Sequence, residues 1–528
     1  MNPISSYFDV NASFGNLAGG VPEFPTCASR LAHMDRLGIS RALVWNVEAG
    51  QHHSLSANRR LLDEVASTPG AQGRIVPELV VSGLIAYEQD GIRKLVDQMQ
   101  EGNTRALRFV NVFGILTLVQ CEPVIRAVQH LKPFLVMNGG ETSTQDILDF
   151  TAMFPDVPLI LSNLSWGKGI GTFDLMRRRQ NVLMENSVWH SWGGVSLAVK
   201  HFGQERVLFG TGCRSHNGAA MAALARAEIT DAQREMIAHG NLDRLTGLKS
   251  PPVMGAASRS NGLWRRCLAG ESLGVDIVDA HGHLGPSAGF VLEYQDESAQ
   301  VTHLLKTMDG LGQRTMIVSG LQALLGSAID GNQQVSTLIK PHADRFLGYL
   351  VFNPYYAEGL TPHLDEWFAN PQWVGFKILC DYWKIKVTDP RFDPIWEYAN
   401  AHRLPVLMHS WENTWDSPSM TRDIVRKYPE LSLLLGHSGG TNGGRREAED
   451  LAAEFPNVFM EWCGSFCSTR TWEETLKTVP ASQVVYGTDA VGHDIYWELG
   501  RLLSIDLDDK VLSPILGRNM RHILDRRR

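Results

Sequence analysis

The sequence predicts an α/β protein made of two tandem (β/α)8 barrels, the TIM-barrel architecture. Three observations favour this fold. The two halves of the 528-residue chain repeat one plan, and each half has the length of a single barrel. Within each half, short apolar runs bounded by turn residues alternate with amphipathic stretches, which is the β-then-α order of a parallel sheet.

The repeat extends along the whole chain. Matched segments begin at Asp9 and Asp279, Met34 and Met308, Ala106 and Gly375, Pro133 and Pro405, Asn181 and Asn457, and Asn241 and Asn519. The offset between the matched segments stays between 269 and 278 residues. Because so constant an offset does not arise by chance, it indicates a tandem duplication.

Eight apolar runs of the second copy are expected to be strands. They are Ile277–His281, Thr315–Ser319, Phe346–Phe352, Val374–Leu379, Pro405–His409, Leu431–His437, Val458–Trp462 and Val484–Asp489. Eight strands in about 250 residues favour a closed barrel over an open doubly wound sheet.

The domain boundaries follow from the repeat. We expect one barrel over residues 1–250 and a second over 273–528, joined by a linker at 251–272 that begins with Pro251-Pro252. Within this linker, Leu263-Trp-Arg-Arg-Cys-Leu has the composition of a short packed helix.

Composition excludes several classes of function. The net charge of -8 is unlike the basic footprint that attracts phosphate backbones, so we expect no nucleic-acid partner. No window reaches the ~18–20 apolar residues of a membrane span, and the N-terminus has no signal-peptide pattern, so we expect a cytoplasmic protein that does not bind membranes. The seven cysteines lack paired spacing and are expected to be reduced thiols.

A His-Gly-His motif ends the first strand of the second copy. His281 and His283 are separated by one residue, and the two-residue period of a strand sends both side chains to one face. Their Cα atoms should lie about 6.6 Å apart, close enough for both imidazoles to reach one ion at ~2.1 Å. Alone the motif is a weak signal in a chain with 18 histidines.

Other metal-binding side chains occur at the ends of later strands. His409 ends the fifth strand, His437 the sixth and Asp489 the eighth. The C-terminal ends of barrel strands meet at one mouth, where barrels of this kind carry their active sites. Together the five side chains favour a metal site over a set of buried histidines that only pack.

The second copy resembles the amidohydrolase superfamily, in the amidohydrolase-related branch that includes enzymes like aminocarboxymuconate-semialdehyde decarboxylase. The resemblance rests on His281-Gly-His283, Gly375-Phe-Lys377, the run from Asp389 to His409, Gly436-His437-Ser-Gly and Gly487-Thr-Asp489. It implies that His281, His283, His409 and Asp489 bind one divalent metal, Zn²⁺ first and Mn²⁺ as the alternative. It also implies that His437 lies beside the ion, with Lys377 as a hydrogen-bonding or charge-stabilising group.

The first copy departs from this pattern at every chemical position. Asn11, Ser13, Arg108, Asn138, Asn163 and Gly212 stand where the second copy has His281, His283, Lys377, His409, His437 and Asp489. Asn, Ser and Gly do not hold a transition metal as imidazole and carboxylate do. We therefore expect a degenerate, metal-free first barrel. The chain would then be an intramolecular pseudo-dimer, free to form a further homo-oligomer.

The resemblance implies an enzyme acting on a small molecule. Our first hypothesis is hydrolysis of an amide or lactone, in which the metal acidifies water, Asp489 transfers the proton and His437 polarises the carbonyl. The alternative is non-oxidative decarboxylation of a small carboxylic acid. It ranks second because no arginine adjoins the five strand-end residues, although Lys377 or Arg214 would supply a cation. A non-catalytic binding scaffold is a third hypothesis.

Several residues near the strand ends allow two interpretations each. Trp383, Trp411, Trp415 and Trp462 either wall a flat substrate pocket or pack on helices. Arg445 and Arg446 are expected on a solvated helix face rather than at a substrate carboxylate. For Cys463 and Cys467, buried packing is favoured over metal binding.

Overall fold

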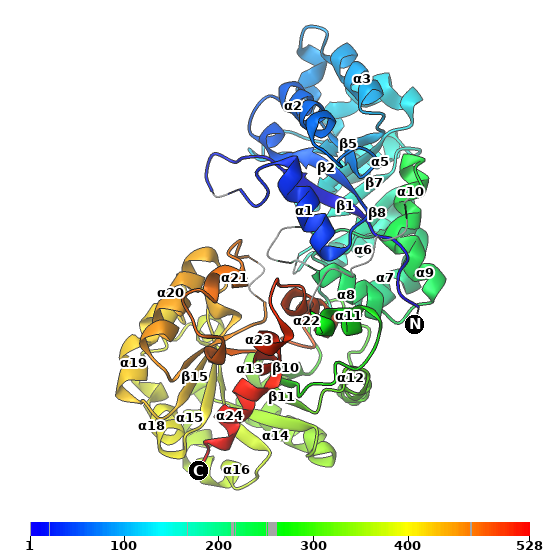
Figure 1. Cartoon of the computed structure of the whole chain (residues 1–528). Coiled ribbons are helices and arrows are strands. Elements are labelled where there is room, and N and C mark those ends of the chain that lie inside the picture. The colour runs from blue at the N-terminus through cyan, green and yellow to red at the C-terminus, as the bar shows by residue number, and fades with distance from the viewer. Residues whose placement is uncertain are drawn as a thin grey trace. The chain divides into compact units, whose positions relative to one another are not determined.

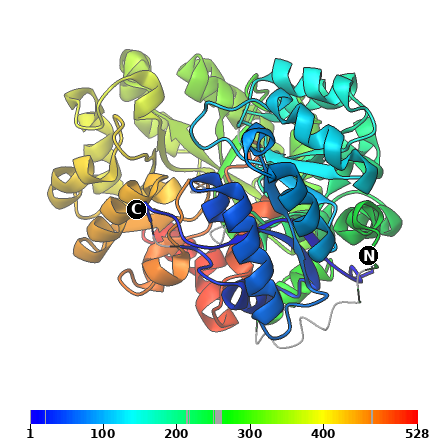
Figure 2. The same ribbon diagram turned by 90° about the horizontal axis from the view of Figure 1, so that it is seen from above.

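A computed structural model describes residues 2–20, 22–165, 167–212, 216, 218–249, 251, 261–464 and 467–528. The chain divides into two compact units, Met1–Arg259 and Ser260–Arg528. Figures 1 and 2 colour the N-terminal unit from blue to green and the C-terminal unit from green to red. The boundary between the units lies inside the expected linker at 251–272.

The C-terminal unit contains one sheet of eight parallel strands in sequence order. These are β10 (Val278–Leu284), β11 (Thr315–Gly320), β12 (Phe346–Val351), β13 (Trp373–Ile378), β14 (Pro405–His409), β15 (Ser432–Gly436), β16 (Val458–Glu461) and β17 (Val484–Val485). The last strand returns to the first, because the Ala280 amide donates to the Tyr486 carbonyl at 2.9 Å and Gly282 bridges Ala490. The sheet is therefore a nearly closed TIM-type barrel, as the sequence predicts for this half.

Helices follow most of these strands and surround the sheet (Figure 1). They are α12 (Glu297–Leu311), α13 (Leu321–Leu325), α14 (Ala328–Ile339), α15 (Ala357–Leu360), α16 (Leu364–Phe368), α17 (Cys380–Trp383), α18 (Asp393–His402), α19 (Arg422–Lys427), α20 (Asn442–Glu454), α21 (Trp472–Thr475), α22 (Ile495–Leu503), α23 (Asp509–Ser513) and α24 (Asn519–Asp525). Local chemistry sets their ends. Asp296 caps α12 by accepting from the Ala299 amide, and Gly312 ends the helix at φ 74°.

The barrel encloses an apolar core to which every strand contributes. The buried cluster contains Val278, Ala280, Ile317, Tyr349, Val374, Leu407, Leu434, Phe459 and Val485, with Met520, Ile523 and Leu524 of α24. Helix α24 packs against β10 and β17, and the cluster joins this helix to the interior of the sheet.

Five predicted strands end earlier than the sequence suggests, and two of these earlier ends affect candidate site residues. Strand β17 ends at Val485 and β15 at Gly436, so Asp489 and His437 lie in the segments that follow. Both residues have positive φ, 58° for Asp489 and 61° for His437. Their side chains are therefore positioned by tight turns and not by strand pleating.

The N-terminal unit contains two parallel sheets, ordered β1-β2-β3 and β4 to β9. The strands are β1 (Phe8–Phe14), β2 (Arg41–Asn46), β3 (Ile75–Pro77), β4 (Leu79–Val81), β5 (Ala106–Phe109), β6 (Phe134–Asn138), β7 (Leu159–Ser162), β8 (Val182–Glu185) and β9 (Val207–Leu208). Only Glu78 separates β3 from β4, and the Val10 amide donates to the Phe209 carbonyl at 3.0 Å. A second closed barrel stays a prediction, because the strand pairing defines two sheets.

The helices of this unit alternate with its strands. They are α1 (Cys27–Leu37), α2 (Ser54–Ser67), α3 (Gly91–Glu101), α4 (Glu122–Val128), α5 (Thr144–Met153), α6 (Gly169–Arg178), α7 (Gly194–Phe202), α8 (Ala219–Arg226), α9 (Asp231–Glu235) and α10 (Asn241–Thr246). Both first strands carry a register shift, between Asp9 and Ala12 in β1 and between Asp279 and Gly282 in β10. The two units thus share this irregularity at matched positions.

The expected linker is only partly a connection. Its residues 252–260 lie outside the described residues, but α11 (Gly262–Leu268) is a helix of the C-terminal unit. The Asn261 side chain donates to the Leu503 carbonyl at 2.6 Å, and Trp264 is fully buried. The packed helix that the sequence allowed within the linker is therefore present.

Within the described residues, we find no helix with the length and apolar character needed to cross a membrane.

Candidate metal centre

The polar end of the C-terminal barrel, which we call the barrel mouth, is formed by side chains at the ends of five strands. His281 and His283 extend from β10, Lys377 from β13 and His409 from β14. His437 and Asp489 follow β15 and β17. All six residues were selected from the sequence, and the contacts below show how closely they approach one another.

In the part of the chain that the structure describes, His281, His283 and Asp489 form one of three groups whose ligand atoms are close enough to share an ion. One ligand atom of each lies within 4.8 Å of the other two. The Oδ1 atom of Asp489 is 2.9 Å from Nε2 of His283 and 3.5 Å from Nε2 of His281. Two imidazole nitrogens and a carboxylate oxygen are the donors of catalytic zinc sites, so this group fits a divalent metal.

A second ring of side chains fixes the orientation of the histidines. Nδ1 of His281 lies 3.2 Å from Oε2 of Glu461, and Nδ1 of His283 lies 2.9 Å from the Ser319 hydroxyl. Each of these contacts engages Nδ1, as the outer partners of metal-bound histidines do, and directs Nε2 into the mouth. There Nε2 of His283 meets Asp489, and Nε2 of His281 lies between Asp489 and Lys377.

His409 and His437 lie beside this group without completing it. The His437 ring is 5.2 Å from the His281 ring and 5.0 Å from the His409 ring, measured between centroids. Nδ1 of His409 is held 3.2 Å from Oδ2 of Asp416. Among the described residues, His409 belongs to none of the groups close enough to share an ion, so its role as a fourth ligand stays a prediction.

Lys377 approaches His281 closely. Its Nζ is 2.7 Å from Nε2 of His281, and the side chain is 1% exposed. Burial lowers the pKa of Lys377, an effect that the charge of Asp489 opposes. The mouth therefore contains one amine in contact with the imidazole of His281.

The electrostatics of the mouth favour metal-binding forms of the histidines. Burial lowers the pKa of His283 to about 4 and that of His437 well below its usual range. Burial alone would raise the pKa of Asp489, but the charges of His281 and its neighbours hold it well below the ordinary value. Neutral imidazoles and an ionised carboxylate are the protonation states that bind a cation.

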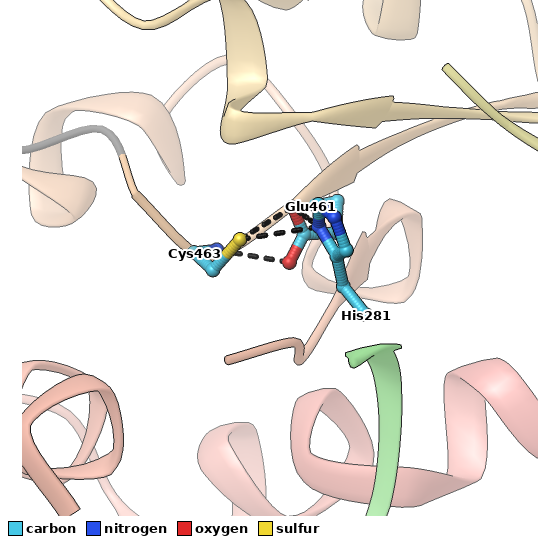
Figure 3. A group of neighbouring side chains, drawn as sticks. All are labelled: His281, Glu461 and Cys463. Atoms are coloured by element: carbon cyan, nitrogen blue, oxygen red, sulfur yellow. Dashed lines mark hydrogen bonds and ion pairs between the residues drawn. The ribbon is translucent and has the colours of Figure 1, made fainter. Parts of the chain in front are cut away.

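Cys463 was not selected as a site residue, but it lies inside the cluster. Its Sγ is 3.3 Å from Nδ1 of His281, 3.6 Å from Nδ1 of His437 and 3.1 Å from Oε2 of Glu461. Figure 3 shows the sulfur directed toward Glu461 and the His281 ring. Burial raises the pKa of the thiol well above its usual range. Cys463 is buried as predicted, but it contacts candidate site residues as well as the core. Buried packing is wrong for Cys467, which is exposed.

His493 is a second residue that sequence reasoning missed. Its Nε2 is 3.8 Å from Oδ2 of Asp489, and its Nδ1 is 3.1 Å from Oε1 of Glu498. Glu498 in turn pairs with Arg501 at 2.9 Å. Its position four residues after Asp489 is the only signal in the sequence.

The tryptophans divide between site and core. Trp411 stacks on His409 with an interplanar angle of 13° and also contacts His437. Trp415 is exposed and lies under Lys386, whereas Trp383 and Trp462 are buried in packing. The substrate-wall interpretation therefore remains for Trp411.

The arginine predictions have mixed outcomes. Arg446 is exposed as expected, but Arg445 is 1% exposed, with its guanidinium 4.4 Å from the centre of the Trp472 ring. The solvated-face interpretation is wrong for Arg445, because the start of α20 turns it into the molecule. Arg214 lies outside the described residues.

The matched positions of the N-terminal unit are bonded to one another. Nδ2 of Asn11 donates to Oδ1 of Asn163 at 3.0 Å, and Nδ2 of Asn163 donates to Oδ1 of Asn138 at 2.5 Å. Arg108 pairs with Glu78 at 2.9 Å, and both are buried. At the positions matched to the histidines and the lysine of the C-terminal unit, the N-terminal unit thus has hydrogen-bonded amides and a buried ion pair.

Comparisons with known proteins cover the C-terminal unit. Residues 278–526 match the sequence model of the amidohydrolase family. No curated protein matches the chain.

Several solved structures resemble about half of the chain. One is 2,6-dihydroxybenzoate decarboxylase from Rhizobium, with 15% identity and a TM-score of 0.37 over 48% of this chain and 98% of that chain. Another is dihydroxybenzoic acid decarboxylase from Polaromonas sp. JS666 with bound manganese, with 15% identity and a TM-score of 0.38 over 48% and 97%. A third is 4-oxalomesaconate hydratase from Rhodopseudomonas palustris, with 16% identity and a TM-score of 0.35 over 47% and 96%.

The nearly closed barrel, the histidines at its mouth and the match over residues 278–526 agree with the resemblance found in the sequence. The C-terminal unit, over residues 278–526, therefore matches the amidohydrolase family.

Proposed function

We propose that the C-terminal unit is a divalent-metal-dependent enzyme whose metal ligands are His281, His283, His409 and Asp489. The observation that carries this proposal is the approach of the imidazoles of His281 and His283 and the carboxylate of Asp489 to within 4.8 Å of one another. Zn²⁺ is the ion that we expect first and Mn²⁺ is the alternative, because both accept imidazole and carboxylate ligands. When bound, such an ion supplies a Lewis acid that polarises a substrate oxygen.

The reaction that this mouth supports best is non-oxidative decarboxylation of a small carboxylic acid. From the sequence alone, hydrolysis is favoured over decarboxylation, because no arginine adjoins the strand-end residues to bind a substrate carboxylate. Lys377 removes that objection, since its Nζ is 2.7 Å from Nε2 of His281 and can pair with a substrate carboxylate. Trp411, which stacks on His409, offers an apolar face to an aromatic or unsaturated acid at the same mouth.

Three side chains of the mouth would act in the decarboxylation. Lys377 holds the carboxylate, and His437 donates to or accepts from a neighbouring substrate oxygen. Asp489 takes up a proton from water and delivers it to the carbon atom that loses CO2, so one proton is consumed for each CO2 released.

Hydrolysis of a lactone or amide is the second candidate. In this reaction Asp489, whose carboxyl group is ionised because its pKa lies well below the usual range, would accept a proton from the attacking water. In that case Lys377 stabilises negative charge on the oxygen of the attacked carbonyl.

Isotope labelling distinguishes the two reactions. We would incubate the metal-loaded protein with hydroxybenzoic acids, unsaturated acids, lactones and amides in deuterated, ¹⁸O-enriched water. Decarboxylation gives one CO2 per product and deuterium at the carbon, whereas hydrolysis places ¹⁸O in the product. Failure to bind a divalent metal would contradict the proposal and favour a binding scaffold.

We further propose that the N-terminal unit is a degenerate, metal-free copy of the same barrel, retained as a partner of the active one. The matched register shifts in β1 and β10 and the single residue between β3 and β4 support a common origin. The bonded amides of Asn11, Asn138 and Asn163 support the absence of a metal.

A further inference from the structure

We propose that the barrel mouth holds a second divalent-ion position, in which Cys463 is a thiolate ligand together with His437 and Asp489. This inference builds on the proposed function, because it adds a position beside the ion held by His281 and His283. Asp489 belongs to both groups, so its carboxylate would bridge two ions.

The distances between the ligand atoms fit an ion. One ligand atom each of His437, Cys463 and Asp489 lies within 4.8 Å of the other two. Nδ1 of His437 and Sγ of Cys463 are 3.6 Å apart. Bond lengths of about 2.05 Å to nitrogen and 2.3 Å to sulfur place two tetrahedral zinc ligands roughly 3.5 Å apart. The two side chains already have this spacing.

The chain closes tightly around this position. Gly464 has φ +69°, and a Cβ atom there would lie 2.3 Å from Nδ1 of His437. Cys463 is fully buried, so its sulfur faces the cluster and not solvent (Figure 3). A glycine at this point allows the imidazole and the sulfur to approach each other.

The N-terminal unit supplies a comparison without these ligands. Ser187 is the counterpart of Cys463, and its hydroxyl donates to Oε1 of Glu185 at 2.7 Å. A hydroxyl therefore suffices for the hydrogen bond to the buried glutamate. Sulfur occurs in the copy that also has His437 and Asp489, while the N-terminal copy has Asn163 and Gly212 at their matched positions.

The ligand type determines which ions this position takes. A thiolate with an imidazole selects Zn²⁺ or Co²⁺ over Mg²⁺ and Mn²⁺. Binding converts the Cys463 thiol and a divalent ion into a thiolate–metal bond, and the thiol proton leaves to solvent.

Cobalt titration of the full-length, metal-stripped protein tests the inference. A first equivalent of Co²⁺ should give the visible bands of bound cobalt, and a second should add a thiolate-to-cobalt charge-transfer band in the near ultraviolet. Cys463→Ser keeps a donor for Glu461 and should lose that band, together with one of the two equivalents. Cys467→Ser, which changes an exposed thiol of the same segment, should keep both.

Three results would overturn the second position. They are visible cobalt bands without a charge-transfer band in the unaltered protein, a charge-transfer band that survives Cys463→Ser, and loss of that band in Cys467→Ser alone. The first result is measured on the unaltered protein, so it does not depend on whether a variant folds. Absence of all cobalt bands would instead overturn the proposed function itself.

Discussion

Asp489 contacts two imidazoles that are each oriented by a further side chain. Glu461 holds His281 and Ser319 holds His283, so both Nε2 atoms are directed toward the carboxylate. Removal of both imidazoles would therefore take away two of the donor atoms of an ion bound at this position.

The double variant His281→Asn and His283→Asn should therefore abolish tight metal binding at this position and all turnover. Asparagine is chosen because the N-terminal unit carries Asn11 at the position of His281. Metal content by plasma mass spectrometry and turnover are the two measurements. His363→Asn, which replaces an exposed histidine of the same unit, is the matched control and should retain both.

The acid sensitivity of the metal-stripped protein should depend on His283. Burial lowers its pKa from 6.5 to about 4, so the folded protein keeps the imidazole neutral while the unfolded chain protonates it. The stabilisation is complete above pH 6.5 and is lost as the pH falls toward 4, by up to about 3 kcal/mol.

His283→Gln removes this titration, so its free energy of unfolding should fall less steeply between pH 7 and pH 4.5. Urea unfolding at several pH values measures the slope. A variant with the same slope as the unaltered protein would show that His283 is not held neutral.

At the scale of the elements, the segments that follow the strands position several side chains of the barrel mouth. Gly464 follows β16 and packs against His437 so closely that an added methyl group would collide with the ring. Gly464→Ala should cost about 1–3 kcal/mol through its positive φ and lower turnover by an order of magnitude or more through displacement of His437. Gly289→Ala, where an added methyl group finds room, should be neutral in both thermal unfolding and turnover.

Strand β5 of the N-terminal unit carries Arg108 at the position matched to Lys377, and Arg108 forms a buried ion pair with Glu78. Arg108 and Glu78 are both 1% exposed or less, and burial raises the pKa of Glu78 to about 7. At pH 8, Arg108→Met should leave an unpaired buried carboxylate and cost about 3–5 kcal/mol. Adding Glu78→Leu should restore most of the loss, as measured by denaturant unfolding. Equal stability of the single and double variants would contradict the pairing.

At the scale of the whole molecule, helix α11 decides where the C-terminal unit begins. Leu263, Trp264 and Cys267 are buried, and the Gly262 amide donates to Asp509 at 2.9 Å. A large apolar side chain contributes about 1.5–3 kcal/mol when buried. A fragment of residues 260–528 should therefore be several kcal/mol more stable than one of 273–528. Chemical denaturation of the two fragments compares them, and equal stability would show that α11 is dispensable.

Much of the architecture follows from the sequence alone. The repeat, the eight strands of the C-terminal unit and the histidines at their ends are visible because hydrophobic period and residue type are local properties of the chain. The family resemblance over the second half rests on the same short motifs and agrees with the match over residues 278–526.

Tertiary structure alone decided which side chains meet. Cys463 contacts His281 across 182 residues of sequence, and His493 approaches Asp489 only because the segment after β17 turns back. Positive φ at His437 and Asp489 places both outside the strands to which the sequence assigned them. The strand pairing of the N-terminal unit likewise gives two sheets where periodicity indicated one. The period of hydrophobic residues is a local property that indicates which face of a helix or strand is buried. Contacts between loops that are far apart in the sequence arise only when all the strands and helices are packed together.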